Sequence, residues 1–188
     1  MTTDSPLILC VGHATLDYVF GVDRIPAEPT KIRAHSFARA GGGMAANAAS
    51  AVVRLGGRAA FVGPVGDDGA ALDVRQSFVA AGVETRWLRT IPGESTSVST
   101  VIVDAKGERL IVNMRGTALR AAPLDDDINA LMGAAAVLAD VRWISGAAPI
   151  LKAARQRGVT TVVDGDIGNA DELSQLLAYA DVVAFSDP

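Results

Sequence analysis

The chain has 188 residues, of which 49% are apolar and 20% are charged, so it can bury the core of one main domain. The formal net charge is -4, and no block of like charge is longer than Asp125-Asp126-Asp127, which argues against a protein that binds a nucleic-acid backbone. The longest uncharged stretch, Ala40 to Val53, has 14 residues and is too short to cross a bilayer, so no membrane association is expected.

The first segments predict a cytoplasmic protein that opens on a buried strand. Residues Met1 to Pro6 carry an acid and no base, so they lack the positive region of a secretory signal. Leu7 to Gly12 is a continuous apolar run, which is typical of a strand covered on both faces. Cys10 lies within this run and is the single cysteine of the chain, so we expect a buried thiol and no internal disulfide.

Short apolar runs and alanine-rich segments of helical length then alternate, which predicts an α/β fold with a parallel sheet and helices on both of its faces. Four further strands are expected at Ala59 to Val62, Ala136 to Ala139, Val159 to Val163 and Val182 to Phe185. Helices are expected at Met44 to Leu55, Ala70 to Ala81, Leu124 to Gly133, Ala147 to Arg157 and Ala170 to Tyr179. Acidic residues cap or begin two of these helices, namely Asp67, Asp68 and Asp125 to Asp127.

Two segments depart from this rhythm, at about residues 18–40 and 97–115. Tyr18 to Arg39 and Ser97 to Met114 alternate polar and apolar residues, as one-sided sheets do. The second segment contains Asp104-Ala105-Lys106-Gly107 between two runs of strand length, which predicts a β-hairpin. Because helices already cover the main sheet, these strands are expected to form a small separate layer, a β-lid.

A triple glycine, Gly41-Gly42-Gly43, runs directly into the first expected helix. Consecutive glycines allow close approach to the backbone, and a helix start offers unpaired N–H groups, so a polar ligand fits here with Asn47 projecting from the first turn. A plain flexible turn explains the same residues. The stretch also fits the dinucleotide pattern G-x-G-x-x-A, but only weakly, because the glycines begin 29 residues after Gly12 and do not follow the first strand at once.

The stretch from Gly42 to Ala49, followed by Gly56 and Gly66, resembles the N-terminal signature of the ribokinase-like (PfkB) carbohydrate kinases. Val11-Gly12 through Asp17 is similar to the opening strand and sugar-binding Asp of that family, and Gly82-Val83 resembles the point where its lid hairpin follows. The resemblance covers the whole chain. It implies a three-layer α/β/α fold with a mainly parallel central sheet and a small β-lid, and the C-terminal part of that fold is expected beyond Pro188.

The same resemblance implies an ATP- and Mg-dependent kinase that transfers the γ-phosphate to a sugar hydroxyl, and a homodimer that forms through the β-lid. Asp17, Gly42, Gly43 and Asn47 match its sugar-binding positions. From the residues alone, Asp17 is expected just past the first strand, where a carboxylate accepts hydrogen bonds from sugar hydroxyls, or else acts as a helix or turn cap. His13 and His35 are isolated, suggest no metal site and are expected to be incidental.

The chain contains neither the Gly-Ala-Gly-Asp turn that supplies the catalytic base and anion hole in this family nor a Walker pattern. We therefore expect no catalytic residue within residues 1–188. They are expected to form the acceptor-binding part, inactive alone, while ATP and Mg are bound mainly by the part beyond Pro188. A non-catalytic sugar-binding module is the alternative.

Lys31, Asn113 and Arg142 are expected to converge on an anionic end of the substrate. The stretches Val137 to Trp143, Thr161 to Asp166 and Lys106 to Asn113 are similar to those of 6-deoxy-6-sulfofructose kinases, which hold the sulfonate with such a Lys, Asn and Arg. A phosphosugar such as fructose 1-phosphate or tagatose 6-phosphate needs a similar pocket. Ribose, fructose or a nucleoside leaves Arg142 without a partner, and Lys31 and Arg142 as solvated surface charges remain the alternative.

Overall fold

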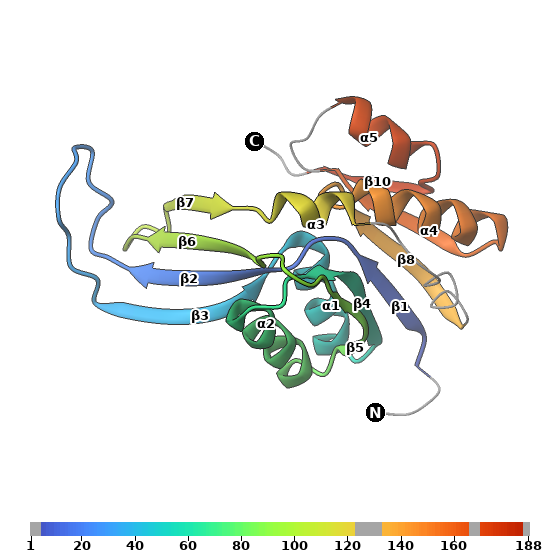
Figure 1. The fold of residues 1–188 in the computed structure, drawn as a ribbon, viewed down its shortest axis with the longest axis horizontal. Helices are drawn as coiled ribbons and strands as arrows, with labels where there is room; N and C mark the ends of the chain where they lie inside the picture. Colours follow the sequence, from blue (N-terminus) through green and yellow to red (C-terminus); the bar gives the residue numbers. More distant parts are fainter. Residues whose placement is uncertain (1–4, 123–132, 166–169, 186–188) are drawn as a thin grey trace.

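The computed structural model describes residues 5–122, 133–165 and 170–185, which form a parallel sheet between two helical layers and a second, smaller sheet (Figure 1). The main sheet has the order β10-β9-β8-β1-β4-β5, with all neighbours parallel. Its strands are β1 (Leu7–Val11), β4 (Arg58–Val65), β5 (Glu84–Thr90), β8 (Ala134–Asp140), β9 (Thr160–Asp164) and β10 (Val182–Ala184). The predicted α/β class with a parallel central sheet is confirmed.

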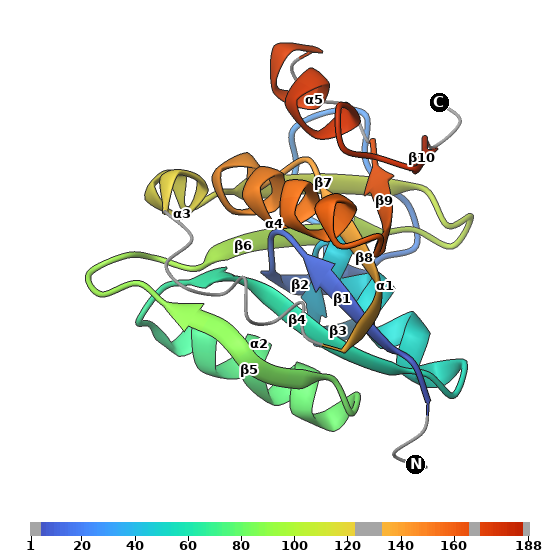
Figure 2. The ribbon, with the colours of Figure 1, turned by 90° about the vertical axis from the view of Figure 1, so that its right-hand side faces the viewer.

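Helices cover both faces of this sheet, as Figure 2 shows. They are α1 (Met44–Arg54) and α2 (Gly69–Ala80) on one face, and α4 (Ile144–Gln156) and α5 (Ala170–Leu177) on the other. The residues of β1 alternate between the two cores: Leu9 packs in the core under α4, whereas Cys10 packs in the core under α1 and α2. Burial raises the pKa of the Cys10 thiol to about 12, so the expected buried thiol is confirmed.

The second sheet extends away from the helical layers in Figure 1 and has the order β3-β2-β6-β7. Its strands are β2 (Thr15–Gly21), β3 (Ser36–Gly42), β6 (Ser97–Val103) and β7 (Arg109–Met114). The pairs β2–β3 and β6–β7 are antiparallel, and β2–β6 is parallel. In the β6–β7 turn, Oδ1 of Asp104 accepts hydrogen bonds from the backbone N–H groups of Lys106 at 2.8 Å and Glu108 at 3.1 Å, so the predicted hairpin forms.

The elements differ from the expectations in three ways. Gly82-Val83 leads into β5, a sixth strand at the edge of the main sheet, and not into the lid hairpin. Leu88 is the buried residue of this edge strand and its neighbours are polar or partly exposed, so it lacks the continuous apolar run of the central strands. The second sheet begins at Thr15 and not at Tyr18, because its first two residues are buried at the junction with the main sheet. The short helix α3 (Thr117–Ala121) was not predicted.

The expected helix at Leu124 to Gly133 lies outside the described residues, apart from Gly133. Asp68 caps α2 as predicted, since its Oδ1 accepts a hydrogen bond from the backbone N–H of Ala71 at 3.0 Å. Asp67 instead accepts a hydrogen bond from the backbone N–H of Gly93 at 2.9 Å. Within the described ranges, no helix combines the length and apolar character that a membrane crossing requires.

Candidate functional site

A cavity of about 290 Å³ lies where the two sheets meet, at the carboxyl ends of β1 and β8. Ligands of open α/β sheets bind at this edge. Side chains from both sheets and from the start of α1 form its wall. They are His13, Thr15, Asp17, Gly43, Met44, Asn47, Ser99, Val101, Ile111, Asn113, Arg115 and Arg142.

Five of the residues singled out in the sequence line this one cavity: Asp17, Gly43, Asn47, Asn113 and Arg142. The other two do not. Lys31 is exposed in the loop that joins β2 to β3, at the far end of the second sheet in Figure 1. Gly42 is buried behind Asp17, and a Cβ atom at position 42 would lie 2.1 Å from Oδ2 of Asp17. Gly42 therefore makes room for the Asp17 carboxylate.

Asp17 is the third residue of β2 and not a residue just past the first strand, so it belongs to the second sheet. Its Oδ1 atom is buried and has no hydrogen-bond partner among the described residues. A position within a strand and an unused buried oxygen exclude the alternative that Asp17 caps a helix. A buried acceptor without a donor carries a free-energy cost that a ligand hydroxyl can remove.

Asn113 is tied to its own sheet by several hydrogen bonds. Its Nδ2 donates to Oγ of Ser99 at 3.0 Å and to the carbonyl of Val98 at 3.2 Å, and its Oδ1 accepts from Nε of Arg115 at 3.1 Å. Oγ of Ser99 lies 3.4 Å from Oγ1 of Thr15, which extends the network to β2. The sequence analysis missed Thr15, Ser99 and Arg115. Cross-strand register sets Thr15 beside Ser97 and Ser99 beside Asn113, and Arg115 directly follows β7.

His13 also lies in the cavity wall, so treating it as incidental was wrong. Burial, followed by the nearby charges of Arg115, Arg142 and Arg120, lowers the pKa of His13 to about 4, so its imidazole is neutral at neutral pH. Its Nε2 atom is buried and finds no hydrogen-bond partner in the described part of the chain. Its place directly after Gly12, at the carboxyl end of a buried strand, was the signal that pointed to it.

Below the cavity wall lies a carboxylate, Asp140, that the sequence analysis did not single out. Asp140 is fully buried, and its oxygens accept three backbone hydrogen bonds: from His13 at 3.1 Å, Ala45 at 3.2 Å and Arg142 at 2.9 Å. Burial raises the pKa of Asp140 to about 6, and these hydrogen bonds oppose the rise.

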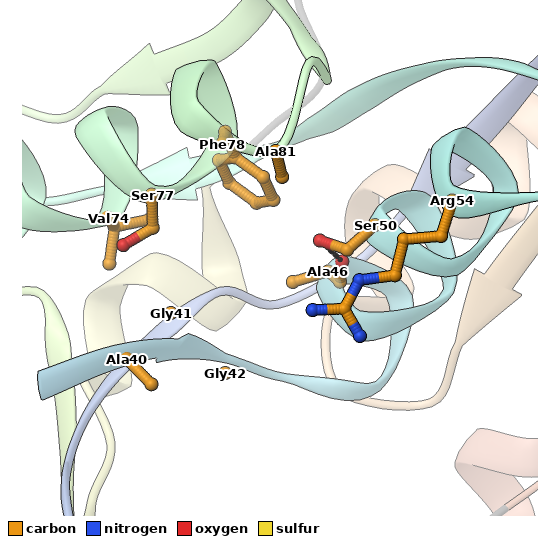
Figure 3. Close-up of a pocket in the computed structure, with 10 residues that line it drawn as sticks. All are labelled: Ala40, Gly41, Gly42, Ala46, Ser50, Arg54, Val74, Ser77, Phe78 and Ala81. Atoms are coloured by element: carbon orange, nitrogen blue, oxygen red, sulfur yellow. Dashed lines mark hydrogen bonds between the residues drawn. The ribbon is translucent and has the colours of Figure 1, made fainter. Parts of the chain in front are cut away.

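A second cavity of about 250 Å³ lies behind the glycine pair Gly41-Gly42, between β3, α1 and α2 (Figure 3). The hydroxyl groups of Ser50 and Ser77 donate to backbone carbonyls of their own helices. Arg54 is the charged residue of this lining, and Figure 3 shows its guanidinium reaching over the space. The two buried side-chain atoms that lack a partner in the described ranges, Oδ1 of Asp17 and Nε2 of His13, belong to residues of the first cavity, which we take as the functional site.

A profile of the family described as "pfkB family carbohydrate kinase" matches residues 5–188. The chain belongs to this family. Among curated relatives, a ribokinase of Arabidopsis thaliana is 28% identical over 174 residues, which are 89% of this chain and 45% of that protein. A probable chloroplastic fructokinase-6 of the same plant is 32% identical over 108 residues, which are 57% of this chain and 27% of that one. The chain therefore spans less than half the length of these relatives.

Solved structures of pfkB-type kinases share the fold. A putative ribokinase from Agrobacterium tumefaciens superposes with a TM-score of 0.92 at 34% identity, and the match covers 96% of this chain and 59% of that one. The structure of Arabidopsis thaliana ribokinase complexed with ribose and ATP superposes with a TM-score of 0.77 at 26% identity, covering 96% of this chain and 60% of that one. This chain thus has the ribokinase-like fold over nearly all of its length.

The magnesium that membership of the family implies has no ligand set among residues 5–122, 133–165 and 170–185. No three His, Cys, Asp or Glu side chains in these ranges gather as metal ligands do. The described ranges therefore contain no cluster that would hold a metal ion by three or more such side chains.

Proposed function

We propose that this chain is the acceptor-binding part of an ATP-dependent sugar kinase that acts in the cytoplasm and transfers the γ-phosphate to a sugar hydroxyl. The observation that carries the proposal is the buried Oδ1 of Asp17, which finds no hydrogen-bond partner among the described residues and lies in the wall of a polar cavity. A sugar hydroxyl donates to this oxygen and offers its own oxygen to a neighbouring donor. Membership of the carbohydrate-kinase family and the shared fold support the same function.

The residues of this chain act by binding and orienting the sugar. Asp17 accepts from one hydroxyl, and Asn47, exposed in the first turn of α1, both donates and accepts. Ser99 on β6 and Asn113 on β7 lie beside Asp17 in the same sheet, so a bound sugar is held between this sheet and α1. Enclosure there excludes water and fixes the hydroxyl in line for phosphoryl transfer, which is where catalysis by positioning arises.

For the substrate we propose 6-deoxy-6-sulfofructose. Arg142 and Arg115 line the cavity with Asn113, and their positive charge supports an anionic end on the sugar. A sulfonate carries one charge, whereas a phosphate carries up to two. Lys31, which lies outside the cavity, is not needed for this arrangement. Ribose and fructose fit a cavity with Asp17 and Asn47 as well, so the two arginines are what favour an anionic sugar over them. Tagatose 6-phosphate also carries an anionic group, and only its higher charge disfavours it against the sulfonate.

The function is tested with the complete protein that contains this chain, by measuring ADP release with ATP and a panel of sugars. We expect turnover with 6-deoxy-6-sulfofructose at a higher kcat/KM than with fructose, ribose or tagatose 6-phosphate. A higher kcat/KM for one of those sugars would contradict the sulfonate assignment and leave the kinase intact. Sugar binding in calorimetry without ADP release would instead identify the non-catalytic sugar-binding module.

We also propose that the complete protein is a homodimer formed through the second sheet. The sheet face turned away from the cavity carries Phe37, Leu110, Val112 and Met114, each between 46 and 65% exposed. Phe37 packs against Tyr18 and Phe20, with ring centroids 6.3 and 5.0 Å apart. An exposed apolar face of this kind is stabilised when a second copy covers it.

Replacing both Leu110 and Val112 with glutamate is expected to convert the dimer to a monomer, because two charges would be buried in the apolar contact. Light scattering coupled to size exclusion measures the mass. The control is Leu72→Glu, which places the same side chain at an exposed leucine of α2 and is expected to leave the dimer intact. A monomeric wild-type protein would contradict the proposed dimer.

A further inference from the structure

Helix α1 begins without a cap of its own. Its N-cap residue is Gly43, which has no side chain, and its first turn, Met44 to Asn47, contains no acidic residue. The first N–H groups of a helix have no partner within the helix and need an acceptor from elsewhere. The backbone N–H of Ala45 finds one 95 positions later in the chain, in Oδ2 of Asp140 at the end of β8.

The same carboxylate holds two other segments. Its Oδ2 also accepts from the backbone N–H of His13, in the connection from β1 to β2, and its Oδ1 accepts from that of Arg142, directly after β8. The packing here is close: a Cβ atom at Gly12 would lie 2.2 Å from Oδ2 of Asp140. Glycine at position 12 is therefore required for the carboxylate to occupy this place.

Each of the three segments contributes side chains to the cavity. The β1–β2 connection leads to His13 and Asp17, the start of α1 supplies Asn47, and the segment after β8 supplies Arg142. Asp140 itself is fully buried and does not line the cavity. A negative charge beside a helix N-terminus is stabilising, and charge-assisted hydrogen bonds to N–H groups are stronger and shorter than neutral ones.

We propose that Asp140 is a positioning residue of the acceptor site, which caps α1 from another strand and holds Asn47, Asp17 and Arg142 at the spacing that the sugar requires. This inference rests on the proposed kinase function. Asp140 acts through the backbone of the three segments and does not contact the sugar. Misplacing binding groups by about 1 Å is enough to lower the rate of a positioned reaction roughly 100-fold.

The test is Asp140→Asn in the complete protein. The amide has the same shape but keeps one acceptor oxygen and turns an NH2 group toward a backbone N–H, so at least one of the three hydrogen bonds is lost. We expect the KM for the sugar to rise roughly 10- to 100-fold, while the KM for ATP stays within about twofold. Asp140→Ser, which is smaller and keeps one oxygen, is used if the amide variant does not fold.

The matched control is Thr161→Val. Thr161 is also fully buried in the main sheet, where its Oγ1 donates to the carbonyl of Tyr179 at 2.6 Å, but it does not line the cavity. We expect this variant to lower Tm and leave the KM for the sugar unchanged. If Asp140→Asn lowers Tm like the control and also leaves the KM for the sugar unchanged, Asp140 is a stability residue only, and the proposal is overturned.

Hydrogen exchange measured by mass spectrometry separates this inference from the proposed function. In the protein without sugar, Asp140→Asn is expected to speed amide exchange at residues 43–47, where α1 begins, and Thr161→Val is not. If the wild-type protein phosphorylates no sugar, the kinase proposal fails. Faster amide exchange at residues 43–47 in Asp140→Asn alone would still support the positioning role of Asp140. Equal exchange in the two variants contradicts that role.

Discussion

Replacing Asp17 with alanine in the complete protein is expected to lower kcat/KM for the sugar about 10- to 150-fold. This factor corresponds to a loss of roughly 1.5 to 3 kcal/mol of transition-state binding, the range for a hydrogen bond to a charged group. The carboxylate is placed by β2 in the cavity wall, with Oδ1 buried and unused by any described residue. Because that oxygen makes no hydrogen bond there, its removal is expected to leave the free energy of unfolding unchanged or slightly increased. Steady-state kinetics and thermal unfolding measure the two effects.

The variant Asp17→Asn keeps one acceptor oxygen and is expected to lose less activity than Asp17→Ala. Asp23→Ala is the control for charge, because Asp23 is an exposed carboxylate outside the cavity. It is expected to have the kinetics of the wild-type protein. Unchanged kcat/KM in Asp17→Ala would show that Asp17 does not bind the sugar and would remove the observation on which the proposed function depends.

Replacing Arg142 with alanine is expected to lower kcat/KM for 6-deoxy-6-sulfofructose, through a loss of roughly 1.5 to 3 kcal/mol of transition-state binding. Activity on fructose is expected to change little. The guanidinium presents a planar pair of donors to sulfonate oxygens, and fructose has no anionic group for it to bind. Its backbone is held 2.9 Å from Oδ1 of Asp140, so the base of the side chain is fixed. Arg142→Lys keeps the charge but not the planar donor pair, and an intermediate loss is expected.

Arg54→Ala is the matched control for Arg142, because it removes an arginine from the wall of the other cavity. We expect it to leave kcat/KM for both sugars unchanged. Equal losses on 6-deoxy-6-sulfofructose and fructose in Arg142→Ala would assign the arginine to general binding and would contradict the sulfonate proposal. The sugar-kinase proposal would stand.

Local patterns were sufficient to predict most of the architecture. Continuous apolar runs predicted five strands, and β1, β4, β8, β9 and β10 all lie where such runs occur, although β10 is an exposed edge strand. Alternation and a four-residue turn predicted the β6–β7 hairpin, because both signals act within about ten residues of the chain. The exception is the edge strand β5, which is only partly buried. Its residues form neither a continuous apolar run nor a regular polar–apolar alternation, so it was not predicted.

The sequence by itself also singled out Asp17, Gly43, Asn47, Asn113 and Arg142, all of which line one cavity. The glycine run before a helix marked Gly43 and Asn47, and the resemblance to the sugar- and sulfonate-binding positions of known kinases marked Asp17, Asn113 and Arg142. The sequence analysis wrongly grouped Lys31 with these residues, because the positive charge of a side chain does not show where its loop carries it. The β2–β3 loop carries Lys31 to the far end of the second sheet (Figure 1).

Only the tertiary structure decided which groups are left without partners and which carboxylate holds the site. Among the described residues, the Oδ1 of Asp17 and the Nε2 of His13 have no hydrogen-bond partner because of what packs around them, and no pattern of neighbours in sequence records this. Asp140 reaches His13, 127 positions away, and Ala45, 95 positions away, through strands paired across the sheet. Hydrogen bonds over such separations depend on strand order and register, so they exist only once the chain has folded.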